Sequence, residues 1–227
     1  MEEEWVPFSL TFVEYPKGDH WGHFLAVLSL VPISVIGVAL PTLILFRRDL
    51  HTMYLTMGLL LNEAVNYVTK KTLRHPRPTL RKVHYNENGM PSSHAQLICF
   101  LALYLLLFIW LRLHRSPSPS FVEWAWKILA SVISLLVAIL VCVGRVYLQY
   151  HTLNQVLVGS VLGATLGAGW FGLLQGAVGP FIFPRLASWP VAQALLVRDT
   201  SSIPHLLSTE HQLLTLEVQR QEMKRHQ

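Results

Sequence analysis

Three short segments of the chain carry polar residues that burial in an apolar protein does not explain. Residues 70–78, 89–94 and 144–155 supply lysine, arginine, histidine and serine side chains. The planar fork of arginine matches phosphate oxygens, and lysine adds a compact positive charge. One histidine can attack phosphorus while a second protonates the leaving oxygen. Together these residue types predict the transfer of a phosphoryl group.

The charged and titratable candidates divide into two groups. Lys70, Arg77 and Arg145 are the cations that can bind phosphate oxygens. His94 and His151 are the candidates for proton transfer and for attack on phosphorus. Any single histidine of the eleven in the chain carries little weight, so the spacing of these two relative to the cations is what supports the interpretation.

Ser92 and Ser93 open a predicted helix in the second segment. The free backbone N–H groups at the start of a helix can also hold an anion. The three segments contain no carboxylate cluster and no set of histidine and cysteine ligands at metal-binding spacing. We therefore expect neither a metal ion nor another cofactor.

The composition indicates the elements that must position these residues. The chain is 52% hydrophobic and only 14% charged, whereas soluble domains carry about 25% charged residues. The net charge of +5 comes from basic residues in short loops between apolar runs. A nucleic-acid surface would instead show a basic stripe with interleaved aromatic residues. The sequence predicts a multi-pass membrane protein whose partner is the bilayer and not nucleic acid.

A helix needs about 20 residues to cross a bilayer. Five apolar runs satisfy or approach this length, which predicts an all-α bundle of about five transmembrane helices. They are Trp21–Phe46, Thr52–Val68, Ala95–Leu111, Ile128–Val143 and Val156–Leu174. In the fifth run Gly159, Gly163 and Gly167 share one helical face, a pattern that favours close packing against another helix.

The chain beyond Gln175 has a different pattern. Pro180, Pro184, Pro190 and Pro204 divide it into pieces too short to span, and we expect these to be helices at the membrane interface. We predict a membrane domain over residues 1–205 and a polar, helical, cytosolic tail over residues 206–227.

Five spans also fix where the polar segments lie. Spans two and four end on the side where the chain begins, and spans three and five start there. Residues 70–93 and 145–151 should therefore meet at one membrane face, although they are far apart in sequence.

The spacing of these residues resembles that of the type 2 phosphatidic acid phosphatase (PAP2) family. The family signature is lysine, six residues and Arg-Pro; then Pro-Ser-Gly-His; then Ser-Arg, five residues, His, three residues and Asp. Three elements match in order: Lys70 with Arg77-Pro78, Pro91-Ser92-Ser93-His94, and Gly144-Arg145 with His151. Ser93 replaces the glycine, Gly144 the serine and Gln155 the aspartate.

The resemblance implies a role for each matching residue. His151 attacks to form a phosphohistidine, His94 protonates the leaving group, and water hydrolyses the intermediate without a metal ion. Arg145 is the third catalytic residue that the resemblance implies. The groups expected to bind phosphate are Arg145, Lys70, Arg77, Ser92 and the Ser93 backbone.

Two further residues are expected to support this site. In the aspartate position, Gln155 can accept the ring N–H of His151 but brings no charge. Glu63 lies two helical turns before Lys70, and an ionisable residue inside a span is usually paired or functional. Pairing of Glu63 with Lys70 or another cation of the site is one interpretation, and a neutral carboxyl bonded to a neighbouring helix is the other.

Further segments narrow the resemblance. Residues 13–16, 61–63, 183–185 and 198–201 match family members that act in the endoplasmic reticulum and convert dolichyl diphosphate to dolichyl phosphate, which recycles the lipid carrier for protein N-glycosylation. The alternatives are a phosphatase for another lipid phosphate and a non-catalytic relative that binds lipid phosphate. Chain-length preference and oligomeric state stay open.

The distribution of charged residues predicts the orientation. Arg47, Arg48, Arg112, Arg115 and Lys127 are expected on the face opposite the site, while the acidic residues 2–4 lie on the site's face. Because basic loops tend to stay cytosolic, we predict an active site that faces the lumen.

Overall fold

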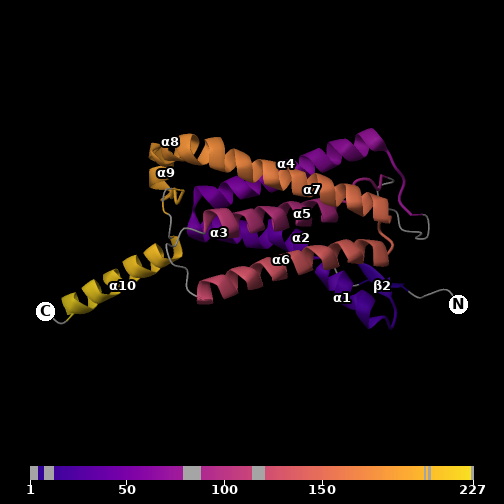
Figure 1. The fold of residues 1–227 in the computed structure, drawn as a ribbon, viewed down its shortest axis with the longest axis horizontal. Helices are drawn as coiled ribbons and strands as arrows, with labels where there is room; N and C mark the ends of the chain where they lie inside the picture. Colours follow the sequence, from indigo (N-terminus) through magenta and orange to yellow (C-terminus); the bar gives the residue numbers. More distant parts are fainter. Residues whose placement is uncertain are drawn as a thin grey trace.

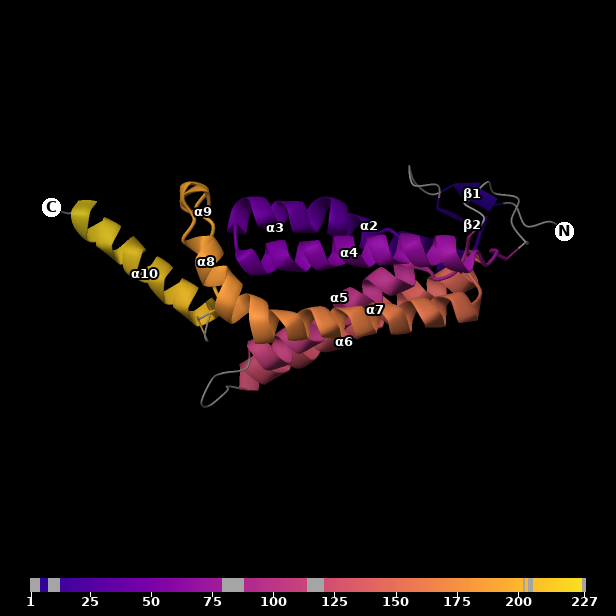
Figure 2. The same ribbon diagram turned by 90° about the horizontal axis from the view of Figure 1, so that it is seen from above.

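The fold is a bundle of long helices that run side by side (Figures 1 and 2). The computed structural model describes residues 5–7, 13–78, 88–113, 121–201, 203 and 206–225, with the main chain alone for 5–7 and 206–208. The acidic start of the chain and Arg115, both used to predict the orientation, lie outside these ranges.

Each predicted span corresponds to one helix or to consecutive helices in the structure. Within the described ranges, four helical stretches are long and apolar enough to cross a membrane: His20–Arg47, Ser93–Arg112, Phe121–Tyr147 and Leu153–Ala187. The remaining predicted span is α4 (Leu50–Leu73), whose 24 residues extend about 36 Å alongside the others (Figure 2). Its polar residues set it apart from the four apolar stretches. The all-α membrane bundle of about five helices is confirmed.

Several spans contain a change of helix type. The first consists of α1 (His20–Leu28), α2 (Val31–Ser34), the π-helix η1 (Val35–Ala39) and α3 (Leu40–Arg47). After α4 come α5 (Ser93–Leu107) with the π-helix η2 (Phe108–Arg112), then α6 (Phe121–Tyr147). The last span joins α7 (Leu153–Leu173), the π-helix η3 (Leu174–Ile182) and α8 (Phe183–Ala187). The short α9 (Pro190–Ala194) and the exposed α10 (Leu206–Arg225) follow.

Local sequence explains where the helices start and stop. Asp49 caps α4 by accepting the backbone N–H of Thr52 at 3.0 Å, and Thr152 caps α7, both by the usual use of a side-chain oxygen at a helix start. α4 ends where Arg74 adopts the left-handed conformation, with φ of 49°. The loops that carry the predicted site begin at these helix ends.

The last span is longer than the sequence predicts. We expected it to end at Leu174, with interfacial pieces beyond, but the helix continues through Pro180 to Ala187. Proline normally breaks an α-helix, because it lacks an N–H and its ring clashes with the preceding turn. Here Pro180 lies inside η3, whose wider turn has a different bonding pattern and accommodates the ring.

The glycine stripe of α7 packs closely against α5, as predicted. A Cβ atom on Gly159 would lie 2.7 Å from the carbonyl oxygen of Ser92. A Cβ on Gly167 would lie 2.6 Å from that of Phe100. Side chains at these positions would push the two helices apart, so the stripe fixes the start of α5 against α7.

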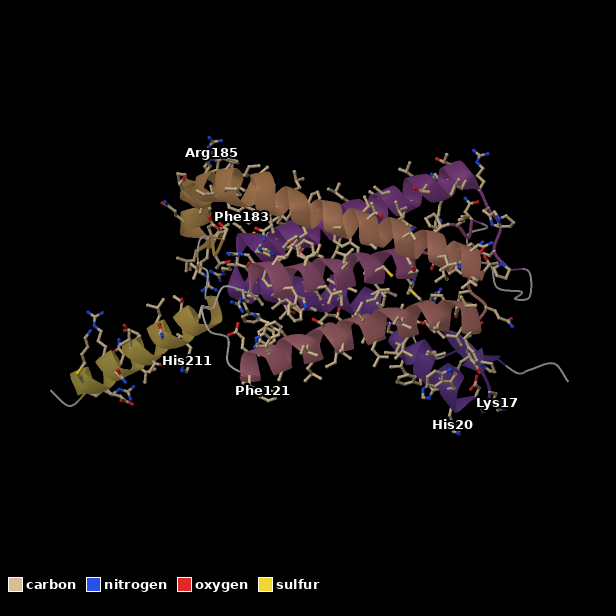
Figure 3. The ribbon with its side chains drawn as sticks, viewed as in Figure 1. Lys17, His20, Phe121, Phe183, Arg185 and His211 are labelled. Carbon is tan, nitrogen blue, oxygen red and sulfur yellow. The ribbon has the colours of Figure 1, made fainter. Side chains whose placement is uncertain are left out.

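The two ends of the bundle differ in character. Lys17 and His20 lie at the end where α4 finishes and α7 begins, and Arg185 and His211 lie towards the other (Figure 3). A short antiparallel ladder of β1 (Trp5–Pro7) and β2 (Glu14–Pro16), which the sequence did not predict, covers the first end.

At the second end Arg47 forms an ion pair with Glu210 of α10 at 2.9 Å. Arg112 donates a hydrogen bond to the carbonyl oxygen of Thr200. The division at residue 205 stays a prediction.

Candidate active site

The three polar segments meet at one end of the bundle, as the topology predicted. Ring atom Nδ1 of His151 lies 2.9 Å from the carbonyl oxygen of Gly89, which joins the third segment to the second. The N–H of Gly89 donates to the carbonyl oxygen of His75 at 2.6 Å, which joins the second to the first. The N–H of Ser92 donates to the carbonyl oxygen of Gln155 at 3.1 Å.

His151 lies buried in the turn between α6 and α7. The backbone N–H groups of Tyr150 and His151 both donate to the carbonyl oxygen of Arg145, at 3.1 Å each. Two oxygens lie near ring atom Nδ1: the Gly89 carbonyl at 2.9 Å and Oε1 of Gln155 at 3.2 Å. Because neither oxygen carries a hydrogen, Nδ1 must carry the proton. The lone pair then resides on Nε2, which is the state a nucleophilic imidazole needs.

Gln155 is completely buried and uses both ends of its amide. Its Oε1 also accepts the N–H of Thr152 at 3.2 Å, and its Nε2 donates to the carbonyl oxygen of Pro76 at 2.7 Å. The amide therefore connects the third segment to the first. A carboxylate in this position could accept from His151 and Thr152, but it could not donate to Pro76.

We expect Gln155→Ala to lower turnover by about tenfold or more, the equivalent of a lost buried hydrogen bond to the nucleophile. Steady-state phosphate release from the purified variant measures this. Asn154→Ala is the matched control, because Asn154 is the adjacent amide and its side chain is exposed. Equal activities of the two variants would remove Gln155 from the site.

The surroundings of His151 keep its ring neutral. Burial is the main cause that lowers the pKa of His151 to about 3, and the positive charges of Arg145 and Arg77 lower it further. The hydrogen bond to Gln155 acts in the opposite direction. At neutral pH the ring is therefore unprotonated and able to attack.

This pKa predicts a pH dependence of stability. Between pH 6.5 and about 3 the unfolded chain binds a proton at His151 that the folded protein does not, so the free energy of unfolding falls as the pH falls. From pH 7 to pH 5 the loss from this residue is about 2 kcal/mol. Thermal unfolding in detergent should show a smaller loss for His151→Gln than for the wild type. Equal losses would contradict the neutral buried ring.

Three cations surround His151. The side chain of Arg145 is buried and stacks on the ring of Tyr150, with 4.0 Å between the guanidinium carbon and the ring centroid. The charges of Arg145, Arg77 and Lys70 all act on His151. Such stacking fixes the plane of the guanidinium, so its N–H fork has a defined direction before any phosphate arrives.

The start of α5 supplies the remaining predicted groups. Lys70 Nζ donates to Ser93 Oγ at 3.5 Å. Ser92 Oγ is buried and has no hydrogen-bond partner within the described ranges. The ring of His94 is hydrogen-bonded to the backbone of Ser29, where α1 ends, and lies within electrostatic range of Arg145 and His151. His94 and His151 are thus close enough for their charges to interact, and their joint role in catalysis stays a prediction.

A buried amide cluster, which the sequence analysis missed, anchors the start of α5 to α4. Gln96 donates through Nε2 to Asn62 Oδ1 at 2.9 Å, and it accepts at Oε1 from Asn66 Nδ2 at 2.7 Å. All three side chains are buried. Asn62 and Asn66 are four residues apart, so the sequence signal was a polar face inside a span. Apart from Asn62 Nδ2, which has no hydrogen-bond partner within the described ranges, these amide groups are paired, and such a buried cluster holds two helices in one register.

Two other residues have a mixed outcome. Glu63 lies close enough to Lys70 for an electrostatic interaction and lines a cavity with Ser93 and His94. Its pairing with Lys70 stays a prediction, and full activity of Glu63→Gln would count against it. His75, which the sequence analysis did not place in the site, is exposed, and its Nδ1 lies 3.2 Å from Nε2 of Gln155. No group of three or more histidine, cysteine, aspartate or glutamate side chains in the described ranges is arranged to hold a metal ion.

The site lies within a region that matches a known family. Residues 51–178 match the PAP2 superfamily, and this range includes every residue that the sequence analysis placed in the site. The chain belongs to the PAP2 superfamily.

Two relatives match almost the whole chain. Dolichyldiphosphatase 1 of Homo sapiens is 44% identical over 225 residues, which cover 97% of this chain and 92% of the human protein. Dolichyldiphosphatase 1 of Dictyostelium discoideum is 37% identical over 217 residues, which cover 93% of this chain and 92% of the Dictyostelium protein.

A solved structure shares the fold. The PAP2 type phosphatidylglycerolphosphate phosphatase from Bacillus subtilis matches with a TM-score of 0.58, over 71% of this chain and 80% of that chain. At 18% sequence identity this likeness concerns the fold alone.

Proposed function

We propose that this membrane protein removes the terminal phosphate from dolichyl diphosphate and releases dolichyl phosphate. The observation that carries the proposal is the state of His151. Its Nδ1–H is held by the oxygens of Gly89 and Gln155, so Nε2 can attack. The substrate is suggested by the relatives named Dolichyldiphosphatase 1, which are similar to this chain along almost its full length.

The reaction proceeds in two displacements. Nε2 of His151 attacks the terminal phosphorus, an N–P bond forms, and the bond to the bridging oxygen breaks. His94 gives its proton to that oxygen, and dolichyl phosphate leaves. Water then attacks the phosphohistidine, returns a proton to His94, and releases inorganic phosphate with the ring of His151 restored. Covalent catalysis of this kind divides one difficult step into two easier ones.

The cations and the helix start stabilise the phosphoryl group during both displacements. Lys70, Arg77 and Arg145 neutralise the charge on the equatorial oxygens, as positively charged side chains do in other phosphoryl transfers. Ser92 and the backbone of Ser93 contribute donors at the start of α5. Because Arg145 is held by stacking on Tyr150 before the substrate binds, its guanidinium needs little reorganisation.

Phosphate release from a panel of lipids tests the substrate. The purified chain in detergent, with EDTA present, should release phosphate from dolichyl diphosphate faster than from phosphatidic acid or a sphingoid phosphate. A preference for one of the other lipids would make the protein a phosphatase for that lipid. No release from any of them would favour a non-catalytic relative.

The proposal extends to location. We place the protein in the endoplasmic reticulum membrane with the site facing the lumen, where release of dolichyl phosphate returns the carrier for protein N-glycosylation. Arg47, Arg48 and Arg112 support this orientation, because they gather at the opposite end of the bundle and basic loops tend to be cytosolic. A glycosylation sequon inserted between Pro7 and Thr11 should be modified. Modification at the tail instead would reverse the orientation.

A further inference from the structure

A cavity of about 300 Å³ lies beside the start of α5, between α2, η1 and α4. Its polar lining residues are Ser93, His94 and Glu63. The rest of its wall is apolar and comprises Pro32, Ile33, Ile36, Gly37 and Leu97. A mostly apolar cavity with a few polar groups is typical of a site for a small molecule or part of a larger one.

The chemistry proposed for the site gives this cavity a direction. In phosphoryl transfer the attacking atom and the leaving oxygen lie roughly in line, on opposite sides of phosphorus. If Nε2 of His151 attacks from one side, the bridging oxygen must face the proton donor His94 on the other. His94 is part of the cavity wall. The group attached to the bridging oxygen must therefore point towards this cavity.

We propose that the cavity between α2, η1, α4 and α5 binds the first isoprene units of the substrate, an assignment that rests on the proposed function. Ser93 and His94 lie beside the phosphate attached to the chain, and the apolar wall contacts the hydrocarbon. Ile33 and Gly37 are exposed on the outer face of the first span, which the bilayer surrounds. The remainder of a long chain can pass between them into the membrane.

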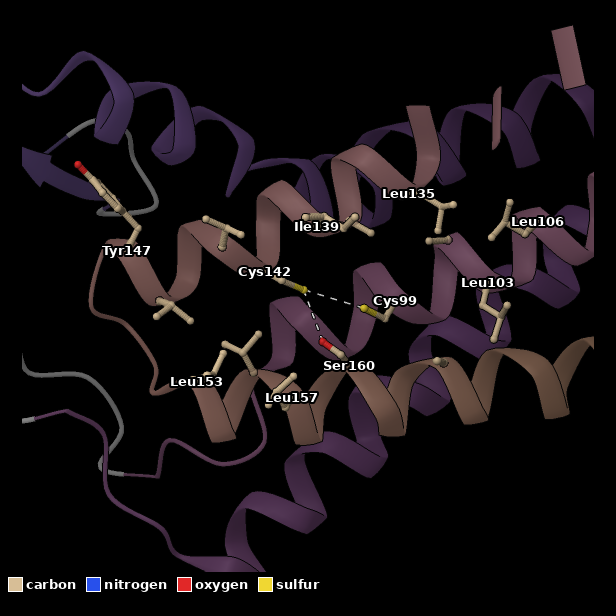
Figure 4. Close-up of a pocket in the computed structure, with 16 residues that line it drawn as sticks. Cys99, Leu103, Leu106, Leu135, Ile139, Cys142, Tyr147, Leu153, Leu157 and Ser160 are labelled. Atoms are coloured by element: carbon tan, nitrogen blue, oxygen red, sulfur yellow. Dashed lines mark hydrogen bonds between the residues drawn. The ribbon is translucent and has the colours of Figure 1, made fainter. Parts of the chain in front are cut away.

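A second, larger cavity is a weaker candidate. It has a volume of about 680 Å³ and lies between α5, α6 and α7 (Figure 4). Its polar residues are Tyr147 and the group of Cys99, Cys142 and Ser160, whose side chains point towards one another (Figure 4). Neither His94 nor any of the phosphate-binding candidates lines it. Size alone would favour this cavity, but it contains no group that faces the leaving oxygen.

Gly37 makes a selective test possible. A Cβ atom built on Gly37 has no neighbouring atom within 4 Å, so a tryptophan there can enter the cavity without a clash at its base. Gly169 of α7 is the matched control, because it is also exposed, also has no atom within 4 Å, and lines neither cavity. Ile36→Trp provides a second obstruction from the same wall.

The full chain, purified in detergent, is assayed with geranylgeranyl diphosphate and with methyl diphosphate, which has no isoprenyl chain. For Gly37→Trp and Ile36→Trp we expect kcat/KM with geranylgeranyl diphosphate to fall by about tenfold, while kcat/KM with methyl diphosphate stays at the wild-type value. For Gly169→Trp both values should stay unchanged. The methyl substrate therefore reports that the phosphate site is intact.

Three results would overturn the assignment. Wild-type activity of both obstructed variants on the long substrate would show that the chain lies elsewhere. Equal losses on the two substrates would show damage to the phosphate site and not obstruction of the chain. A wild-type protein that hydrolyses neither substrate would refute the proposed function, and the assignment with it.

Discussion

With His151 replaced by glutamine, phosphate release from an isoprenyl diphosphate is expected to fall by at least about 10⁴-fold, the scale seen when a covalent nucleophile is removed. Glutamine is polar and close in size to histidine, but it has no basic nitrogen to attack phosphorus. His151 is buried beside Arg145, and its ring is hydrogen-bonded to the Gly89 carbonyl oxygen, whereas the exposed ring of His75 reaches Gln155 from the other segment. Water cannot readily replace a nucleophile fixed in that position.

Trapping of the intermediate separates this chemical role from a structural one. Wild-type protein mixed with substrate labelled in the terminal phosphate and quenched in alkali should retain label on His151. His151→Gln should retain none and still bind orthovanadate, a phosphate analogue. His20→Gln is the control, because His20 is an exposed histidine at the same end of the bundle. Label retained by His151→Gln would assign the nucleophile to another residue.

Hydrophobic patterning predicted the spans and the shared membrane face, since both depend on residue types that repeat over a whole helix. The meeting of His151 with the second segment followed from the number of spans alone. The same patterning failed at Pro180, because a sequence window treats proline as a helix end and carries no signal for a π-helix. Propensity rules describe the α-helix, and a wider turn lies outside them.

The parts of the site that the sequence did not reveal are backbone groups and partners from distant segments. The Gly89 carbonyl oxygen accepts from His151, but a carbonyl is present at every residue and leaves no mark in a sequence. The role of Gln155 was half predicted. Its contact with His151 followed from spacing, whereas its bond to Pro76 needed the loop geometry. That bond gives a physical reason for an amide where the family has a carboxylate.

The same limit applies to the positioning of His94. Its bond to the Ser29 backbone exists because α1 ends at Leu28 and α2 begins at Val31. A break of this kind exposes backbone groups that a continuous helix would use internally. Within an apolar run that reads as one span, the sequence shows only Pro32 as a sign of the interruption.

His94→Asn is expected to make the reaction strongly dependent on the leaving group. A general acid contributes about 10²- to 10⁴-fold, and most where the leaving oxygen is basic. We expect kcat/KM of His94→Asn to fall by about 10³-fold with phenyl phosphate, whose leaving phenol has a pKa near ~10 as in tyrosine. With p-nitrophenyl phosphate, whose leaving group is much more acidic, the loss should be about tenfold or less.

The ratio of the two losses is the informative quantity, because a variant that merely distorts the site lowers both rates together. His51→Asn makes the same substitution at a histidine that is hydrogen-bonded to Tyr104 far from the phosphate site, and it should leave the ratio unchanged. Because one ring N–H of His94 is donated to the Ser29 backbone, the other ring nitrogen must also carry a proton when His94 protonates the leaving oxygen. If His94→Asn and the wild type depend on the leaving group to the same extent, the proton comes from another group. The direction assigned to the leaving oxygen would then have no support.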